Sequence, residues 1–397
     1  MSVEHEDLTL RVPLKRLARF RSGGAIDGKE LLNEGEFPVY GGNGIRGFTS
    51  KWNIRGSNLL VGRQGALAGN VHRVTGPIWA SEHALIASLS ELIHFDFAYY
   101  LLRNMNLNQY SQAAAQPGIS ASVIQSVHIT IPKSTRQQQD IAEFLDLRTA
   151  EIDGLIEKLA REVELLERYR RELIAHTVTR GLDPDAPMRD SGFEWIGEIP
   201  AGWTQVSLKS MLRRVSVKNE PKRRVLSVER ANGVVDRERE GSPDNHNRLP
   251  DDLSGYLAVD SGQFVMNKMK AWRGSYGVSK MNGIVSPAYY VFDLHFLNVE
   301  FFNWTIRSQA YVPFFGRDSY GIRTDQWDFK IAALRSIPFY VPPADEQIEI
   351  VSFLQAKTVA VDSAITDIVK QIELLGSYRK QVIHDAVTGK VRVGEVA

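Results

Sequence analysis

The sequence predicts an α+β protein in which two mixed α/β domains alternate with two long helices that pair as an antiparallel coiled coil with pseudo-two-fold symmetry. Three observations predict this fold: a gapless internal repeat, a heptad pattern in both copies of it, and two intervening segments of short apolar-alternating runs. The 397 residues also exceed the length at which one hydrophobic core usually stops growing, so several domains are expected.

The internal repeat relates residues 144–179 to residues 353–388 at a constant offset of 209. Identical side chains recur throughout both copies. Among them are Asp153 with Asp362, Leu165 with Leu374, Tyr169 with Tyr378, and Arg170 with Arg379. A gapless repeat of this length indicates two copies of one structural element.

Apolar residues in both copies follow alternating steps of four and three, which is the pattern of a coiled-coil seam. The first copy has Ile152, Ile156, Leu159, Val163, Leu166 and Leu173, and the second has Val361, Ile365, Ile368, Ile372, Leu375 and Val382. One arginine interrupts each seam at the equivalent repeat position, Arg170 in the first copy and Arg379 in the second. Each helix could instead pack on its own domain, but two equivalent helices in the same register favour pairing with each other. We expect helices of roughly 35 residues, or on the order of 50 Å.

The two segments outside the repeat begin alike, with RVPLKRL at 11–17 and QVSLKSM at 205–211, and they end alike, with SVHITIP and SIPFYVP. Runs such as SNLLVGR and GIVSPAYYVFDL, bounded by Gly, Pro, Asn and Ser, predict short strands and turns. The expected organisation is a first domain at 1–133, a long helix at 134–182, a linker at 183–196, a second domain at 197–343 and a long helix at 344–397.

A net charge of +1 excludes a protein that simply coats nucleic acid, so any DNA binding must come from local patches. Two such patches exist. Residues 8–130 include twelve basic and seven acidic residues, and residues 209–224 include seven basic residues and one acidic residue. The absence of cysteine, an acidic start without an apolar signal segment, and the lack of a long apolar run predict a cytoplasmic protein.

Motifs that would mark the chain as an enzyme are missing from the sequence. It has no phosphate-binding GxxxxGK[ST] loop, no HExxH, no GxSxG and no adenine-methyltransferase tetrapeptide, and its nine histidines are scattered. Gly42, Gly44 and Gly47 satisfy GxGxxG, but neither an amphipathic helix nor a suitably placed acid follows, so a glycine-rich turn is favoured. We therefore expect a non-catalytic chain without a metal site or cofactor of its own.

Candidate DNA contacts come from glycine-bounded and basic loops. Arg63 and Gln64 are the side-chain types that bond to guanine and adenine edges, and NKMKAWRG interleaves basic residues with an aromatic one. The alternatives are a purely structural turn at the glycines, solvated arginines, and a packed Trp272. The full set is Asn43, Arg46, Lys51, Arg63, Gln64, Ser120, Lys218, Lys268, Lys270, Trp272, Arg273, Tyr320 and Arg323.

Three segments resemble the HsdS family, the specificity subunits of type I restriction-modification systems. TRGLDPDAPMRDSGFEWIGEIPAGW at 179–203 resembles the family's junction between the first long helix and the second target-recognition domain. VMNKMKAWRGSYGVSKMNGIVSPAYYVF resembles the core of one type of recognition domain, and YGGNGIRGF with LLVGRQGALAGNV resembles another. One departure is that the first domain lacks the WIGEIPxGW lead-in, so contacts made by that segment are absent or supplied differently there.

The resemblance implies that each recognition domain reads one half of a bipartite, asymmetric double-stranded DNA site and that the helices set the spacer. It also implies two methyltransferase (HsdM) subunits that use S-adenosylmethionine for adenine-N6 methylation, and HsdR subunits that add cleavage driven by ATP and Mg. Two rival hypotheses remain at this point. A coiled-coil scaffold without a nucleic-acid role would explain the repeat but not the basic patches, and a self-sufficient nuclease or methyltransferase is opposed by the missing motifs.

Overall fold

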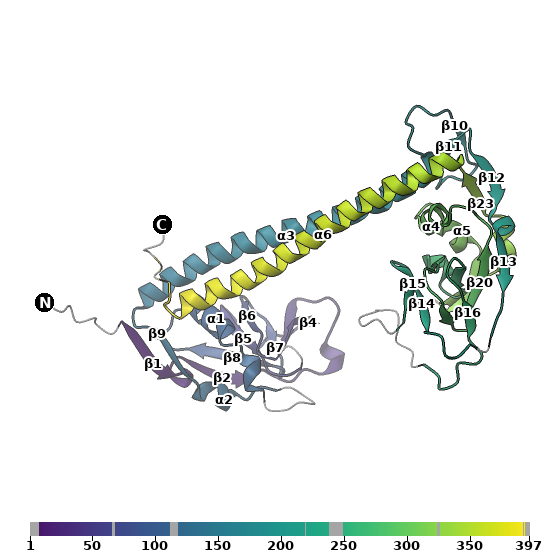
Figure 1. Ribbon diagram of the computed structural model, residues 1–397. Coiled ribbons are helices and arrows are strands. Elements are labelled where there is room, and N and C mark those ends of the chain that lie inside the picture. The colour runs from purple at the N-terminus through teal and green to yellow at the C-terminus, as the bar shows by residue number, and fades with distance from the viewer. Residues whose placement is uncertain are drawn as a thin grey trace. The chain divides into compact units, whose positions relative to one another are not determined.

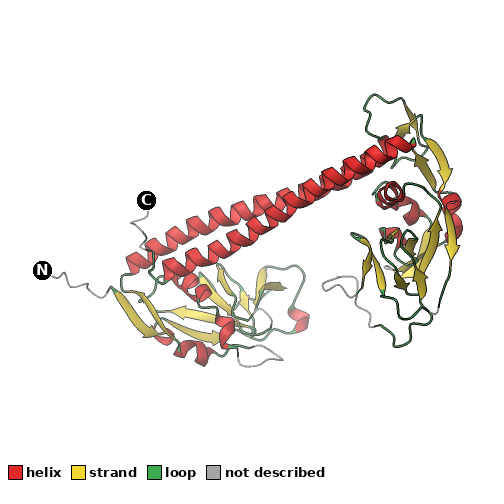
Figure 2. Ribbon diagram, in the orientation of Figure 1, coloured by secondary structure: helices red, strands yellow, loops and turns green. Residues whose placement is uncertain are grey.

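The computed structural model describes residues 8–65, 68–111, 118–218, 220–237, 249–323, 326–391 and 393; within β21 and β22 the side chains of residues 322, 323 and 326 lie outside the description. The chain divides into two compact units. Unit 1 comprises residues 1–160 and 369–397, and unit 2 comprises residues 161–368. Figure 1 labels their elements, and Figure 2 shows the strands of each unit as small sheets accompanied by helices.

Two long helices contribute to both units: α3 (Thr135–Arg180, 46 residues) and α6 (Ala344–Val387, 44 residues). They are longer than the roughly 35 residues expected, because each begins about nine residues before the repeat. Ser134 caps α3 by accepting a hydrogen bond from the Gln137 N–H at 3.3 Å. Beyond each helix a glycine, Gly181 or Gly389, has φ of +74°, the left-handed conformation that ends helices.

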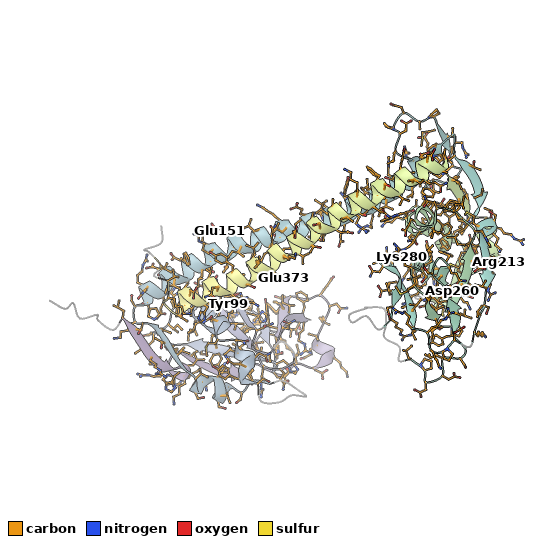
Figure 3. The ribbon with its side chains drawn as sticks, viewed as in Figure 1. Tyr99, Glu151, Arg213, Asp260, Lys280 and Glu373 are labelled. Carbon is orange, nitrogen blue, oxygen red and sulfur yellow. The ribbon has the colours of Figure 1, made fainter. Side chains whose placement is uncertain are left out.

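The predicted pairing of the helices is confirmed. In unit 1 the first part of α3 lies against the last part of α6, and in unit 2 the last part of α3 lies against the first part of α6, so the pair is antiparallel. Every predicted seam residue is buried or half-buried, whereas the glutamates of α3, such as Glu151, are exposed (Figure 3). The apolar seam therefore excludes water, and the charged faces remain solvated.

Unit 1 contains a four-stranded antiparallel sheet and a smaller three-stranded one. Their orders are β2-β8-β5-β6 and β4-β3-β7, and the first and last strands of the domain, β1 and β9, form a separate antiparallel pair. The strands are β1 (Thr9–Pro13), β2 (Ala18–Ser22), β3 (Phe37–Gly41), β4 (Gly44–Thr49), β5 (Asn58–Gly62), β6 (Val71–Val74), β7 (Trp79–Ala80), β8 (Ala84–Leu89) and β9 (His128–Pro132). The helices are α1 (Phe95–Asn104) and α2 (Ala121–Ser126), with 3-10 turns η1 (Leu14–Arg16), η2 (Gly28–Glu30) and η3 (Leu107–Tyr110).

Unit 2 has a four-stranded sheet of order β13-β20-β17-β18 and several two-stranded pairs, including the terminal pair β12 and β23. The strands are β10 (Met188–Asp190), β11 (Glu198–Pro200), β12 (Thr204–Ser207), β13 (Leu212–Val215), β14 (Leu226–Glu229), β15 (Gly233–Asp236), β16 (Leu257–Val259), β17 (Phe264–Asn267), β18 (Tyr276–Val278), β19 (Gly283–Val285), β20 (Tyr289–Leu294), β21 (Ser319–Arg323), β22 (Gln326–Phe329) and β23 (Pro338–Val341). The helices are α4 (Val299–Arg307) and α5 (Val312–Arg317), with η4 (Leu208–Met211), η5 (Ala271–Arg273) and η6 (Ile331–Arg335).

Both long helices enter the hydrophobic core of each unit. In unit 1 the core includes Leu145 from the start of α3 and Val387 from the end of α6. In unit 2 it includes Leu354 from the start of α6 and Val178 from the end of α3, which are the same repeat positions at the offset of 209. Each domain is thus closed by the helix that follows it and by the end of the other helix, so the repeat sets the packing as well as the order of elements.

Within the described residues, no helix combines the length and apolar character that a membrane span requires.

Candidate nucleic-acid interface

Three loops of unit 1 come together through polar contacts. The Gln64 side-chain oxygen lies 2.8 Å from Nδ1 of His83, and the Arg63 N–H donates to the His83 carbonyl at 2.9 Å. The Asn70 amide donates to the Asn43 side-chain oxygen at 3.0 Å. We call Asn43, Arg63, Gln64, Asn70 and His83 the polar loop cluster.

Glycines explain how these loops approach one another. A Cβ on Gly42 would lie 3.0 Å from the Gln64 carbonyl oxygen and 3.3 Å from that of His83, and Gly44 has a φ of +100°. Only residues without a side chain fit this turn without displacing the neighbouring backbone. Gly44 and Gly47 belong to strand β4, so the GxGxxG segment is a β-hairpin and not the strand-to-helix turn of a dinucleotide site.

Hydrogen bonds fix the side chains of the polar loop cluster. Nη1 of Arg63 donates to the Ser22 hydroxyl at 3.0 Å, which holds the guanidinium at the end of β2. Nε2 of His83 lies 3.1 Å from a Glu82 carboxylate oxygen while Nδ1 faces Gln64, so both ring nitrogens face acceptors. Burial lowers the pKa of the neighbouring His72, which therefore favours the neutral form. The cluster thus offers fixed polar groups of several kinds.

Of the three other predicted residues of unit 1, Ser120 and Arg46 lie near this cluster. Ser120 follows Ile119, whose N–H donates to the Arg63 carbonyl at 2.8 Å, so the loop before α2 adjoins the cluster. Arg46 is exposed, and its side chain lies across Gly41. Lys51 forms an ion pair with Glu30, which offsets its charge.

Unit 2 presents a different arrangement, in which aromatic rings and cations stack. The rings of Trp272 and Trp327 stack at 4.7 Å, and the Arg273 guanidinium lies 4.3 Å from the Trp272 ring centroid. Tyr320 is 61% exposed, and Lys330 lies over its ring at 5.0 Å. Trp272 is half-buried, so its ring is packed on one side and accessible in part.

A second tyrosine of unit 2 lies between two cations. Lys268 Nζ and the Arg214 guanidinium lie 4.7 Å and 5.1 Å from the ring of Tyr290. Burial, and then repulsion from Arg214, lower the pKa of Lys268, whose ammonium donates to the Pro287 carbonyl at 2.7 Å. We call Lys268, Trp272, Tyr290, Tyr320 and Trp327 the aromatic cluster.

Sequence reasoning missed several members of these two sets. Trp327 lies seven residues after the predicted contact Tyr320, so its tryptophan was a usable signal. Four further residues could be found only from the fold, because each reaches its cluster from another strand or loop. They are Asn70, His83, Arg214 and Tyr290. Lys218 is exposed next to Val217, whose carbonyl accepts from Ala258, and Lys270 is half-buried. The side chain of Arg323 lies outside the described residues.

The basic segment at 209–224 is not the uncompensated patch that its local composition suggested. Arg213 pairs with Asp293 at 2.7 Å, Arg223 with Asp260 at 2.6 Å, and Arg224 with Asp236 at 3.1 Å. These acids lie 12 to 80 residues away in sequence, so a count over neighbouring residues could not include them. Arg214, beside Tyr290, is the arginine of this segment that joins the aromatic cluster.

The lead-in to the second domain contacts the start of α6. Trp203 is 3% exposed, and its indole N–H donates to the Glu346 carboxylate at 3.0 Å. Burial raises the pKa of Glu346. The corresponding position in the first repeat copy, at the offset of 209, is Gln137, so the first domain lacks the acid as well as the lead-in.

Among the residues that the structure describes, no three His, Cys, Asp or Glu side chains are grouped closely enough to hold a metal ion. The contacts of the two clusters are hydrogen bonds, ring stacking and cation–ring interactions. These are the interactions with which proteins recognise bases and phosphates.

Comparison with known proteins finds similarity in part of the sequence and in the fold. Residues 11–165 match the family described as "Type I restriction modification DNA specificity domain". Over the whole chain, the fold is that of a solved structure described as "Structural basis underlying complex assembly and conformational transition of the type I R-M system", with a TM-score of 0.68, 12% identity, and coverage of 97% of this chain and 99% of that one.

Two curated relatives agree with that class. The "Type I restriction enzyme EcoprrI specificity subunit" of Escherichia coli is 39% identical over 140 residues, which cover 34% of this chain and 35% of the relative. The "Putative type I restriction enzyme specificity subunit S.HindORF215P" of Haemophilus influenzae is 26% identical over 142 residues, covering 35% and 37%. The matches thus span about a third of each relative. The first part of the chain is thus similar to type I restriction-modification specificity subunits, and the fold of the chain is shared with a solved structure of the type I R-M system.

Proposed function

We propose that this chain binds double-stranded DNA sequence-specifically, and that each of its two domains recognises one half of a bipartite, asymmetric site. The observation that carries this proposal is the pair of solvent-accessible side-chain clusters, one in each unit, mounted on a repeated framework. A framework with two equivalent ends suits a two-part site, and different clusters suit two different half-sites.

The polar loop cluster has the chemistry for direct recognition of base edges. Arginine pairs bidentately with guanine, and glutamine or asparagine pairs with adenine. Arg63 and Gln64 are adjacent, and their contacts with Ser22 and His83 restrict their orientation. Restriction of this kind lowers the entropy lost on binding.

The aromatic cluster has a different chemistry. Stacked tryptophans beside Arg273 and an exposed Tyr320 offer flat apolar surfaces next to cations. Such surfaces suit thymine methyl groups, sugars and phosphates. Adenine-N6 methylation would require the target base to leave the duplex, so both domains would bind around that base and leave it extractable.

The long helices would set the spacer between half-sites and dock the partner subunits. Leu165 and Tyr169 are 42% and 49% exposed in unit 2, and their repeat counterparts Leu374 and Tyr378 are 69% and 59% exposed in unit 1. Each pair spans one helical turn on one helix face. The same exposed apolar pair, present once in each unit, supports docking of two copies of one partner, the HsdM methyltransferase subunit.

In this proposal the chain itself is non-catalytic and works in the cytoplasm. The HsdM subunits would bring S-adenosylmethionine, and HsdR subunits would bring ATP- and Mg-dependent cleavage. The chain's own contribution is the choice of DNA site, which rests on the two side-chain clusters rather than on reactive groups.

Selection from a random duplex pool tests the DNA-binding function. The chain, co-purified with its methyltransferase subunits, should retain duplexes that share two short motifs at a fixed spacing. Arg63→Ala with Gln64→Ala should relax one motif only, while Arg136→Ala, at an exposed arginine of α3 paired with Asp140, should change neither. Retention without sequence preference would contradict the proposal, and failure to retain any duplex of the pool would favour a scaffold.

A further inference from the structure

A basic hollow lies on unit 1 beside the polar loop cluster. It has a volume of about 1080 Å³ and is lined by β2, η1, the end of β8 and Gln125 of α2. Its charged residues are Lys15, Arg16, Arg19 and Arg21, all exposed. Of the eleven lining residues, all within the described part of the chain, none is acidic. The four positive charges therefore add to one positive electrostatic potential at the hollow.

The alternation of β2 explains why these arginines are displayed. Ala18 and Phe20 are 3% and 8% exposed and belong to the core, so Arg19 and Arg21 point to the opposite face of the strand. β2 is an edge strand of its sheet, and the Gln125 side-chain oxygen accepts the Phe20 N–H at 2.9 Å. That contact and the charges discourage the addition of another strand, which leaves the hollow for a different occupant.

The strand that carries two arginines of the hollow ends at a residue that contacts the polar loop cluster. Ser22 ends β2, directly after Arg21, and its hydroxyl accepts a hydrogen bond from Arg63. By the alternation of the strand, Ser22 lies on the face of β2 opposite to Arg19 and Arg21, so the hollow and the polar loop cluster are adjacent along β2 but use different faces of it. A duplex that placed a base edge against Arg63 would bring its adjoining backbone toward β2.

The corresponding arginine in unit 2 is paired with an acid. The segments 11–17 and 205–211 correspond at an offset of 194, which aligns Arg19 with Arg213. Arg19 lies opposite Ser88 of the neighbouring strand β8. Arg213 lies opposite Asp293 of the neighbouring strand β20 and donates two hydrogen bonds to it. Figure 3 labels Arg213 on β13 at the surface of unit 2. Asp293 neutralises this position in the second domain, and Ser88 leaves it charged in the first.

We propose that the hollow binds the phosphate backbone of DNA flanking the half-site recognised by the first domain, and that it gives this domain most of the chain's sequence-independent affinity. Arginine and lysine contact phosphates, and the hydroxyls of Ser88 and Ser90 can donate to phosphate oxygens. A duplex backbone is an extended row of anions, which matches cations spread along a strand better than a single anion would. The inference rests on the proposed DNA-binding function.

Salt dependence of binding tests this inference with the complete complex of the chain and its methyltransferase subunits. Each phosphate contact contributes about 0.9 to the slope of log affinity against log salt concentration. Arg19→Gln with Arg21→Gln should therefore reduce the slope by about two and weaken specific and random duplexes by the same factor. The matched control Arg136→Gln should leave the slope unchanged.

A second variant keeps both arginines and tests the electrostatic contrast directly. Ser88→Asp introduces into unit 1 the acid that unit 2 carries as Asp293, at an exposed site where misfolding is not expected. It should lower the salt slope in the same sense as the double arginine variant. Thermal unfolding curves matching the wild type would establish that both variants are folded.

The outcomes separate this inference from the proposed function. Sequence-selective wild-type binding with an unchanged slope in both variants would refute the phosphate site and leave the function standing. Absence of sequence-selective binding by the wild type would refute the function itself. Loss of methyltransferase subunits from the variant complexes, detected by native mass spectrometry, would assign the hollow to an acidic protein surface and overturn the proposal.

Discussion

Arg379 of α6 donates two hydrogen bonds to Asp153 of α3, at 2.7 and 2.9 Å, and the repeat places an equivalent ion pair in the other unit. There Arg170 of α3 contacts Asp362 of α6, with Nε at 2.8 Å from one carboxylate oxygen and Nη2 at 3.3 Å from the other. Each arginine lies in the apolar seam and binds an aspartate on the facing helix. The arginine that interrupted both heptad patterns is therefore paired across the helices.

Reversing one of these pairs should reveal the interaction between its members. Arg379→Asp places a carboxylate beside Asp153 and should lower the free energy of unfolding by about 1 kcal/mol, because Asp153 is half exposed and solvent weakens the repulsion. Adding Asp153→Arg should restore most of the loss. Urea unfolding of the four proteins of this cycle gives the coupling energy. Strictly additive effects would show that the pair does not stabilise the helix contact.

Substitution of Gln138, near the start of α3, should lower the free energy of unfolding by a larger amount. This residue is fully buried, and its side chain accepts from the His94 N–H at 2.7 Å and donates to the Leu92 and Pro132 carbonyls at 3.1 and 2.9 Å. Gln138→Leu would leave those backbone groups unpaired and should cost about 2 to 3 kcal/mol in chemical denaturation.

The neighbouring Gln137 provides the control for that substitution. It is exposed, so Gln137→Leu should change the stability by less than about 0.5 kcal/mol. Equal effects of the two substitutions would mean that loss of glutamine itself, and not loss of the buried contacts, controls stability.

The helices were the most predictable part of this fold, and the interface was the least. The seam follows from local periodicity, and the repeat at 209 residues provides a second copy for comparison. Arg63 and Gln64 could be proposed from the sequence because their side-chain types bond to base edges and they lie between two glycines, and their contact with DNA stays a prediction. His83 reaches Gln64 and Arg214 reaches Tyr290 only through strand order and register, which single-sequence patterns do not determine. The pairing of Arg213 with Asp293, 80 residues apart, escaped prediction for the same reason.

Tyr100 should make the stability of unit 1 sensitive to alkaline pH. Its hydroxyl donates to Asp146 of α3 at 2.6 Å, and burial raises the pKa of Tyr100 to about 12 from an ordinary value near 10. The folded state therefore retains a proton that the unfolded state loses, and this contribution to stability falls as the pH rises from about 10 to 12. Tyr100→Phe should make the decline in that window shallower, as measured by urea unfolding at successive pH values. An unaltered decline would exclude Tyr100 as a source of the dependence.

The exposed Leu and Tyr pairs on the long helices predict the stoichiometry of the assembly. If two methyltransferase subunits bind as proposed, Leu165→Glu with Tyr169→Glu should remove one of them, because it places charge on one proposed docking face and leaves the Leu374 and Tyr378 face intact. Native mass spectrometry would detect the change from two partner copies to one. The same substitutions at Leu374 and Tyr378 should give the same result, and all four together should leave none bound.

Leu155 distinguishes this duplicated surface from general loss of apolar area. It is 49% exposed on α3, but its repeat counterpart at the offset of 209 is Ala364, so it does not belong to a matched pair. Leu155→Glu should retain both partner copies. If it removes a partner as efficiently as the paired substitutions do, or if the quadruple variant still binds two copies, the subunits dock elsewhere and the exposed pairs need another explanation. Retention of two copies after Leu155→Glu, with stepwise loss in the paired variants, would connect the internal repeat directly to the number of partners.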